Sequence, residues 1–274
     1  MKFWKTAAFS AGAALLLLLT GCGGRQADAG VLFREAESAA EAMKSCEAAF
    51  SDSLVFTADG KRHSFRSSGK LTYAAEPFAL HAVRTSQSDG LSGRSESYTV
   101  TENGGLWFYN RGAEGWEKAD AQGLDTSPLA QIDLLGLLKS AEEEKYVRGT
   151  ELDSRRVHKI ELKLKNEALR GAVENIVTAS GLGAGSRTIV QTLLDGAPPV
   201  YAYAYIDEES GTLSRLELDA AGTLDRVFQN IDGAGVTVRV SEWKIAGSLS
   251  EIGTAPPVAL PAEAQKAAEV RAQG

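Results

Sequence analysis

The spacing of apolar residues changes from a helical period to a period of two along the first half of the chain. Residues 32–49 carry apolar positions three or four apart, with charged residues between them, which predicts an amphipathic helix. From Phe50 onward apolar and polar residues alternate, and Asp59-Gly60 and Asn103-Gly104 supply hairpin turns. The pattern predicts a helix followed by a meander of antiparallel strands that reaches about Lys118.

The second half mixes the two periods. Ser127-Pro128 is typical of a helix start, and the apolar run to Leu138 predicts a helix buried on more than one side. Further elements are expected as strands at 145–147 and 157–164, an amphipathic helix at 167–180, and strands at 200–206, 213–218 and 236–245. Residues 187–194 fit a strand or a helix, and the glycine-rich stretch 181–186 fits a flexible loop. These elements predict one α+β domain over residues 31–250, built on a curved antiparallel sheet of about ten strands.

Several strands carry apolar or aromatic residues on both faces, so both faces need cover. One interpretation is a sheet packed between helices, with tyrosines that tolerate solvent. The other is a concave face that forms an apolar cavity, partly plugged by the helix that begins at Pro128. The candidate cavity residues are Phe56, Phe65, Phe78, Leu80, Trp107, Tyr109, Leu134, Leu138 and Tyr203.

The N-terminus has the parts of a bacterial secretory signal. Lys2 and Lys5 precede an apolar run, and Leu19-Thr20-Gly21-Cys22 resembles a lipobox. This resemblance implies a signal peptide over 1–21, cleavage before Cys22 and diacylation of the Cys22 thiol. The mature protein is then expected on the extracytoplasmic face of the cell membrane, with a tether over 22–30. An uncleaved anchor helix is the alternative, although the run is shorter than the roughly 20 residues a membrane span needs.

Composition restricts the partners. The net charge of −7 argues against nucleic acid, whose phosphates require a basic surface. With Cys22 acylated, Cys46 has no partner for a disulfide, and its place in the predicted helix indicates a small buried apolar residue. The tail over 251–274 is rich in alanine and proline, which predicts disorder.

No complete catalytic or metal-binding constellation occurs in the sequence. His63, His81 and His158 stand apart from one another, at no metal-ligand spacing. Ser67-Ser68-Gly69-Lys70 and Ser241-Glu242-Trp243-Lys244 satisfy S-x-x-K, but both lie in strand-like runs, whereas that motif needs a helix start. Acidic groups at 142–144 and 207–209 could hold a cation loosely, and solvated turns are the simpler interpretation. We therefore predict no catalytic residue, no metal and no cofactor.

Short motifs across residues 31–247 carry a resemblance to a known family. They are Glu76-Pro77-Phe78-Ala79-Leu80-His81, Glu96-Ser97-Tyr98, Gly105-Leu106-Trp107-Phe108-Tyr109 and Trp116-Glu117-Lys118. With the lipobox, they resemble lipoproteins of unknown function common in spore-forming Bacillota and, more distantly, the LolA/LolB and LppX/LprG lipoprotein superfamily. That resemblance implies an unclosed half-barrel wrapped over helices, with an apolar cavity for acyl chains and no catalytic residue.

Three functions are compatible with these observations. The first is non-enzymatic binding of a lipid or other amphiphile in the concavity. The second is an envelope scaffold or signalling lipoprotein that binds a protein partner, for which a large apolar surface patch would be evidence. The third is an enzyme, which would need titratable groups clustered in a cleft.

Overall fold

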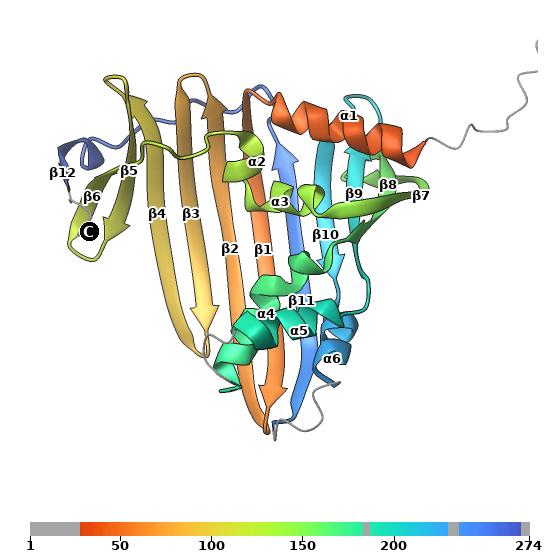
Figure 1. The fold of residues 1–274 in the computed structure, drawn as a ribbon. Coiled ribbons are helices and arrows are strands. Elements are labelled where there is room, and N and C mark those ends of the chain that lie inside the picture. The colour runs from red at the N-terminus through yellow and green to blue at the C-terminus, as the bar shows by residue number, and fades with distance from the viewer. Residues whose placement is uncertain (1–27, 183–186, 230–235, 270–274) are drawn as a thin grey trace, which may run out of the picture.

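A single curved sheet of twelve strands forms the framework of the protein (Figure 1). The structure is a computed structural model that describes residues 28–182, 187–229 and 236–269. The strand order is β12-β6-β5-β4-β3-β2-β1-β11-β10-β9-β8-β7, and every neighbouring pair is antiparallel except β12 with β6. The strands are β1 (Ser45–Ala58), β2 (Lys61–Ala75), β3 (Phe78–Ser88), β4 (Leu91–Glu102), β5 (Gly105–Gly112), β6 (Gly115–Asp120), β7 (Ala141–Leu152), β8 (Arg155–Leu164), β9 (Val200–Asp207), β10 (Leu213–Asp219), β11 (Val238–Ser250) and β12 (Ala268–Glu269). The predicted α+β half-barrel is confirmed, with two more strands than expected.

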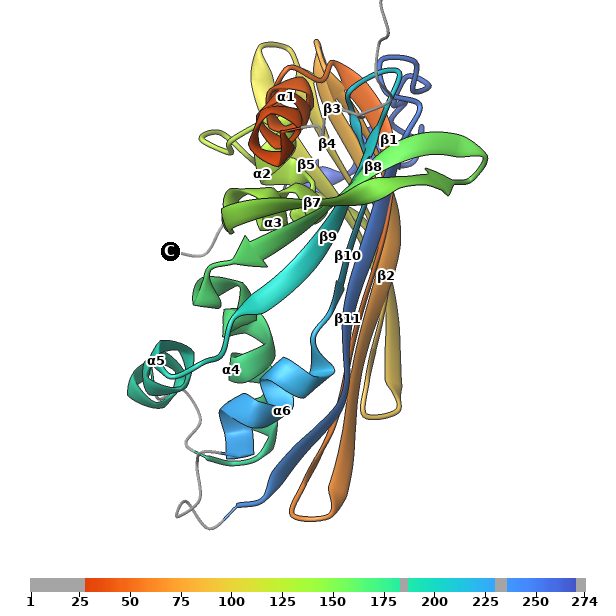
Figure 2. The same ribbon diagram turned by 90° about the vertical axis from the view of Figure 1, so that its right-hand side faces the viewer.

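The helices lie on one face of this sheet, which we call the inner face (Figure 2). They are α1 (Ala29–Glu41), α2 (Pro128–Gln131), α3 (Asp133–Lys139), α4 (Arg170–Ala179), α5 (Arg187–Asp195) and α6 (Ala221–Gln229), with short 3₁₀ turns η1 (Asn166–Leu169) and η2 (Ala264–Lys266). Their apolar sides and the inner face of β1, β2 and β8–β11 form the main core. The opposite, outer face of the sheet carries no helix of this set except the short η2.

Helix α1 begins where the sequence supplies an N-cap. The Asp28 carboxylate accepts hydrogen bonds from the amides of Gly30 (3.0 Å) and Val31 (3.2 Å), which satisfies donors that lack a partner within the helix. Phe33, Ala36 and Ala40 are buried on the side that faces the sheet. The helix therefore starts within the expected tether, whose last two residues belong to α1.

The expected helix over 32–49 is wrong in its last part. It ends at Glu41, and residues 45–58 form β1, which pairs with β2 on one side and β11 on the other. Cys46 is buried in this strand and not in a helix. Apolar residues at 46 and 48 fit both periods, and pairing on both edges decides for the strand.

The helix expected after Ser127 is interrupted. Ile132 has an extended backbone (φ −106°, ψ 99°), which separates α2 from α3. Leu129, Ile132, Leu134, Leu135 and Leu138 are all buried. The break lets two short helical segments turn apolar side chains toward the inner face.

Residues 187–194, ambiguous in sequence, belong to helix α5, and α6 was not expected at all. The C-terminal segment also differs from the expectation of disorder, because residues 251–269 follow the outer face to the edge of β6. There β12 pairs in parallel with Glu117 and Lys118. Ala264 is fully buried against a second apolar cluster that contains Tyr98, Val100 and Tyr109. This small outer core covers part of the face that no helix covers.

Candidate functional site

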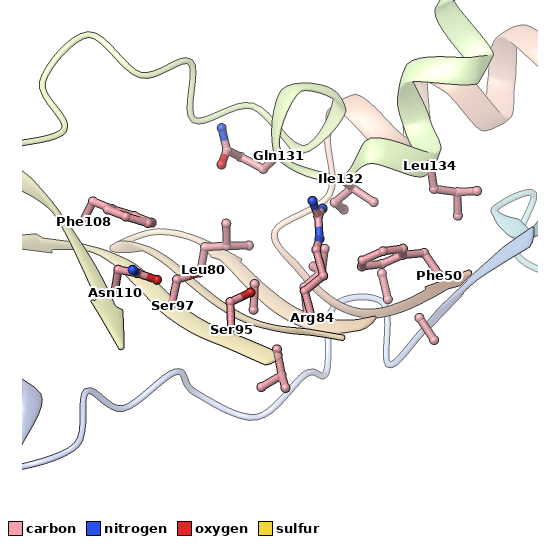
Figure 3. Close-up of a pocket in the computed structure, with 15 residues that line it drawn as sticks. Phe50, Leu80, Arg84, Ser95, Ser97, Phe108, Asn110, Gln131, Ile132 and Leu134 are labelled. Atoms are coloured by element: carbon pink, nitrogen blue, oxygen red, sulfur yellow. The ribbon is translucent and has the colours of Figure 1, made fainter. Parts of the chain in front are cut away.

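A cleft of about 310 Å³ remains between the inner face of the sheet and α2–α3 (Figure 3). Strands β1 to β5 form its floor and α2 and α3 form its roof. The lining residues are Ala48, Ala49, Phe50, Leu71, Leu80, Ala82, Val83, Arg84, Ser95, Ser97, Phe108, Asn110, Gln131, Ile132 and Leu134. The cleft lies beside the main core, on the side of the inner face formed by β3 to β5.

The cleft exists because the strands beneath it carry small side chains. The register places Ala82 opposite Leu71 on β2 and opposite Ser97 on β4. An alanine and a serine in the middle of the floor leave a gap that larger residues would fill. The roof is held away by Leu134, which rests on β11 at Gly247, where a side chain carbon on the glycine would lie 2.7 Å from the leucine methyl groups.

One wall depends on a second glycine. A Cβ on Gly69 would lie 2.6 Å from ring atoms of Phe50, so the phenyl ring of Phe50 can lie across β2 only because residue 69 has no side chain. The guanidinium carbon of Arg84 lies 5.0 Å from the centre of that ring, a cation–π contact. The β1–β2 register continues unbroken through Gly69, which lies opposite Phe50.

The two sides of the cleft differ in chemistry. Leu80, Ile132 and Leu134 form an apolar wall, and Phe108 extends this wall to solvent with 38% of its surface exposed. Polar side chains from β3 to β5 and α2 reach into the same space in Figure 3; they belong to Arg84, Ser95, Ser97, Asn110 and Gln131. Such a lining suits a ligand with an apolar part and a polar part.

The structure separates the candidate cavity residues into three groups. Leu80 and Leu134 line the cleft. Four others do not line the cleft and belong to the main core or pack against it: Phe56, Phe65, Phe78 and Leu138. The remaining three, Trp107, Tyr109 and Tyr203, lie on the outer face, contrary to the prediction.

The outer-face residues have partners of their own. Tyr109 donates a hydrogen bond to Glu102 at 2.6 Å, and Lys118 lies 4.1 Å from the ring centre of Trp107. Tyr203 donates to Glu161 at 3.2 Å and has Lys159 3.9 Å above its ring. On β9 the alternate residues, such as Ala204, are the ones that enter the main core.

Sequence reasoning missed Phe50, Arg84, Phe108, Asn110 and Gln131. The alternation of residues on β5 does show that Phe108 lies on the opposite face from Trp107 and Tyr109. The missing information was which of the two faces turns inward. The residues on α2 could not be placed before the break at Ile132 was known.

The groups considered for catalysis are dispersed. Ser67 and Lys70 lie on opposite faces of β2, and the Ser241 hydroxyl donates to the carbonyl of Val55 at 3.2 Å. Each histidine has a separate neighbour, as in the 2.7 Å contact of His63 Nδ1 with Asp89 and the 3.2 Å contact of His81 Nε2 with Glu96. Within the described ranges, no group of three or more histidine, cysteine or acidic side chains could hold a metal ion.

The lipobox and Cys22 lie outside the described residues. Among the helices that the structure describes, none has the length and apolar character needed to cross a membrane.

Comparisons with solved structures give neighbours among bacterial lipoproteins. The chain is similar to LprF from Mycobacterium bovis, with a TM-score of 0.48 and 12% identity over 85% of this chain and 95% of that one. It is also similar to the Mycobacterium tuberculosis lipoprotein LppX, with a TM-score of 0.42 and 14% identity over 85% of this chain and all of that one. A LolA superfamily protein from Nitrosomonas europaea gives a TM-score of 0.17 and 11% identity over 85% of this chain and 94% of that one. No model of a known family and no curated protein matches the chain. At these levels of similarity, a ligand or partner must be inferred from the residues of this chain.

Proposed function

We propose that the protein is anchored to the extracytoplasmic face of a membrane through Cys22 and binds one amphiphile non-enzymatically in the cleft below α2–α3. The observation that carries the proposal is the cleft itself, with an apolar wall of Leu80, Phe108, Ile132 and Leu134 and a polar side at β3–β5. An apolar chain against that wall is stabilised at roughly 25 cal/mol per Å² of apolar surface buried. The polar group of the ligand then lies near Ser95 and Asn110.

The size of the cleft sets the size of the ligand. Its 310 Å³ is at the lower end of the roughly 300–1,000 Å³ of small-molecule sites. Elsewhere α1 and α3–α6 pack on the inner face of β1, β2 and β8–β11 and form the main core. We therefore propose a ligand with one apolar chain.

The Cys22 anchor completes this proposal. Acyl chains contribute about 0.8 kcal/mol per buried CH₂, and stable anchoring needs more than one chain, which a diacylated cysteine provides. Such an anchor would hold the cleft near the lipids from which an amphiphile could be taken.

Native mass spectrometry of a Cys22→Ser variant made in a lipid-containing host tests the binding. An added mass that extracts into organic solvent is the expected result. Ala82→Leu and Ser97→Leu fill the floor of the cleft and should remove that mass. Ser248→Leu is the matched control, because Ser248 lies on the outer face of β11, next to Gly247, and should keep the mass.

A protein that stays free of added mass after incubation with membrane lipids contradicts the proposal and favours the protein-partner alternative. In the described residues, the exposed large apolar side chains are Val31, Leu91, Phe108, Leu124, Val147 and Tyr201. They come from separate elements of the chain, so this set does not by itself favour that alternative.

A further inference from the structure

The outer face of the sheet carries a group of basic residues that the cleft does not use. Arg62, Arg66 and Lys70 occur at every fourth position of β2, so they share one face. That face is the outer one, because the adjacent residues His63, Phe65 and Leu71 pack inward. Arg94 on β4 and Arg239 on β11 face the same way, and all five side chains are exposed.

The strand register brings these five residues onto one surface. Arg62 and Arg239 both lie opposite Thr57, one on each side of β1. Arg94 lies opposite Thr85 on β3, and Lys70 and Arg94 line the same hollow. Figure 2 shows the strands of this region without a helix on their outer side.

None of these five cations has an ion pair within the described part of the chain. Other basic residues on the outer face are paired, such as Lys244 with Asp219 at 3.3 Å and Arg215 with Glu217 at 2.7 Å. Glu47 is the acidic residue that lines the hollow shared by Lys70 and Arg94. In a chain with a net charge of −7, this surface is a local concentration of positive charge, and such a surface attracts anions.

Two hollows run through this surface and join. One of about 850 Å³ contains Lys70 and Arg94, one of about 300 Å³ contains Arg66, and Ser68 and Thr85 line both. Small hydroxyl residues, including Ser51, Ser53, Ser68 and Thr85, contribute to the remaining lining, and Asp52 is the acidic lining residue of the smaller hollow. We call this continuous surface, defined by Arg66, Ser68, Lys70, Thr85 and Arg94, the cationic trough.

We propose that the cationic trough binds an extended polyanion, a flexible polymer that carries repeated phosphate or carboxylate groups. Guanidinium groups bind either anion with two parallel hydrogen bonds, and the hydroxyl groups between them donate further hydrogen bonds. The row of cations along β2 fits a linear array of charges, which a single small anion does not provide. This proposal is independent of the amphiphile site, which lies on the opposite face.

The anchoring membrane is a less suitable partner for the trough. Figure 1 places α1, where the described chain begins, at one end of the sheet and the hairpin between β1 and β2, next to Arg62, at the opposite end. A membrane held at the α1 end would lie away from Arg62. The row of cations instead runs along the length of the sheet.

Binding to long-chain inorganic polyphosphate and to polyglutamate tests the proposal, with vesicles that contain anionic lipid as a third probe. We expect the Cys22→Ser protein to bind at least one of the two polymers, with an affinity that falls steeply as salt is added, because counterions are released on binding. The triple variant Arg66→Gln/Lys70→Gln/Arg94→Gln should bind about tenfold or more weakly and show a smaller salt dependence. The stronger polymer identifies the anionic group.

The triple variant Arg148→Gln/Arg155→Gln/Arg156→Gln is the matched control. It removes the same charge from exposed residues of the β7–β8 hairpin and should keep the affinity within about twofold. Arg66→Lys/Arg94→Lys keeps the charge and should retain most of the binding. Equal losses in the two triple variants, no binding to either polymer at low salt, or binding to vesicles alone would overturn the proposal.

Discussion

Leu134 of α3 packs directly on Gly247 of β11. A Cβ at residue 247 would lie 2.7 Å from both methyl carbons of Leu134, closer than van der Waals contact permits. The glycine sets the distance between the helix that roofs the cleft and the sheet beneath it. The contact therefore links the stability of the fold to the shape of the cleft.

Gly247→Ala should push α3 away from the sheet. We expect a loss of about 1–3 kcal/mol in the free energy of unfolding, the usual cost of overpacking, together with altered amphiphile binding. Urea unfolding measures the first effect and native mass spectrometry the second. Gly136→Ala, also in α3, is the control, because a Cβ there meets nothing within 4 Å and alanine favours a helix. An unchanged Gly247→Ala protein would contradict this account.

Gly69→Ala should disturb the other wall of the cleft. The added carbon would lie 2.6 Å from the Phe50 ring and 2.6 Å from the carbonyl oxygen of Val83. The ring has to move, so we expect a loss of about 1–3 kcal/mol and a loss of the Phe50–Arg84 contact. Gly93→Ala on β4 should be tolerated, since the nearest atom would be the Ser86 hydroxyl at 3.5 Å. Equal stability of the two variants would refute the role assigned to Gly69.

The carboxylate of Asp89 should make stability depend on pH. It accepts a hydrogen bond from the Ser64 amide at 2.8 Å and lies 2.7 Å from His63 Nδ1. The Ser64 amide first, and then His63, lower the pKa of Asp89 below its ordinary value of 3.8. A lowered pKa in the folded state gives a stabilisation that is fully present above pH 3.8 and is lost as the pH falls through the folded pKa.

Asp89→Asn should therefore be less stable than the parent protein at neutral pH, with a gap that closes in acid. Asparagine tolerates the positive φ of 47° at this turn, so the backbone is kept. Urea unfolding at a series of pH values measures the gap. Asp153→Asn, at a turn residue with a φ of 48° and no side-chain hydrogen bond within the described residues, should change little. A gap that does not vary with pH would argue against the Asp89 interactions.

The thiol of Cys46 should be unreactive in the folded protein. Burial, with a smaller effect from Glu47, raises its pKa to about 12, and the side chain has no exposed surface. In a Cys22→Ser protein, iodoacetamide should label Cys46 only after unfolding, because the thiolate is the reactive form. Rapid labelling under native conditions would mean that β1 opens locally.

Ala264→Arg should release the C-terminal segment from the outer core. Ala264 is fully buried against a cluster that includes Tyr98 and Tyr109, and an arginine does not fit there, at a cost of about 1–3 kcal/mol. Hydrogen exchange should become faster in β5 and β6 and stay unchanged in β8 and β9. Glu263→Arg, at an exposed neighbouring position, should have no such effect.

The sequence was sufficient for the meander of β1 to β6. Turns such as Asp59-Gly60 and Asn103-Gly104 have positive φ values that these residues adopt readily, and the alternation between them specifies strands. The start of β1 was not predictable, because residues 42–49 satisfy a helical period equally well. Only the neighbours β2 and β11, the latter far along the chain, decide the conformation there.

The inner lining of the cleft was harder to predict than the fold. On β5, Phe108 and Tyr109 are both aromatic, so hydrophobicity alone does not show which faces the helices. The answer depends on residues 256–267, which cover Tyr109 on the outer face and leave Phe108 for the inner one. This contact joins segments more than 140 residues apart in the chain, so the local sequence around β5 cannot predict it.

The pairing of β1 with β11 has a consequence for how the molecule assembles. On one side of this seam β1 to β6 each pair with the next strand in the sequence, and on the other side β7 to β11 do the same. The seam itself joins residue 47 to residue 250. As the chain is synthesised, the first half can form its hairpins early, but one edge of β1 has no neighbouring strand until β11 has been made. Pairing of β11 with β1 therefore joins the two halves of the sheet late in folding. If the chain were cut between β6 and α2, we expect the two fragments to associate through the β1–β11 pairing.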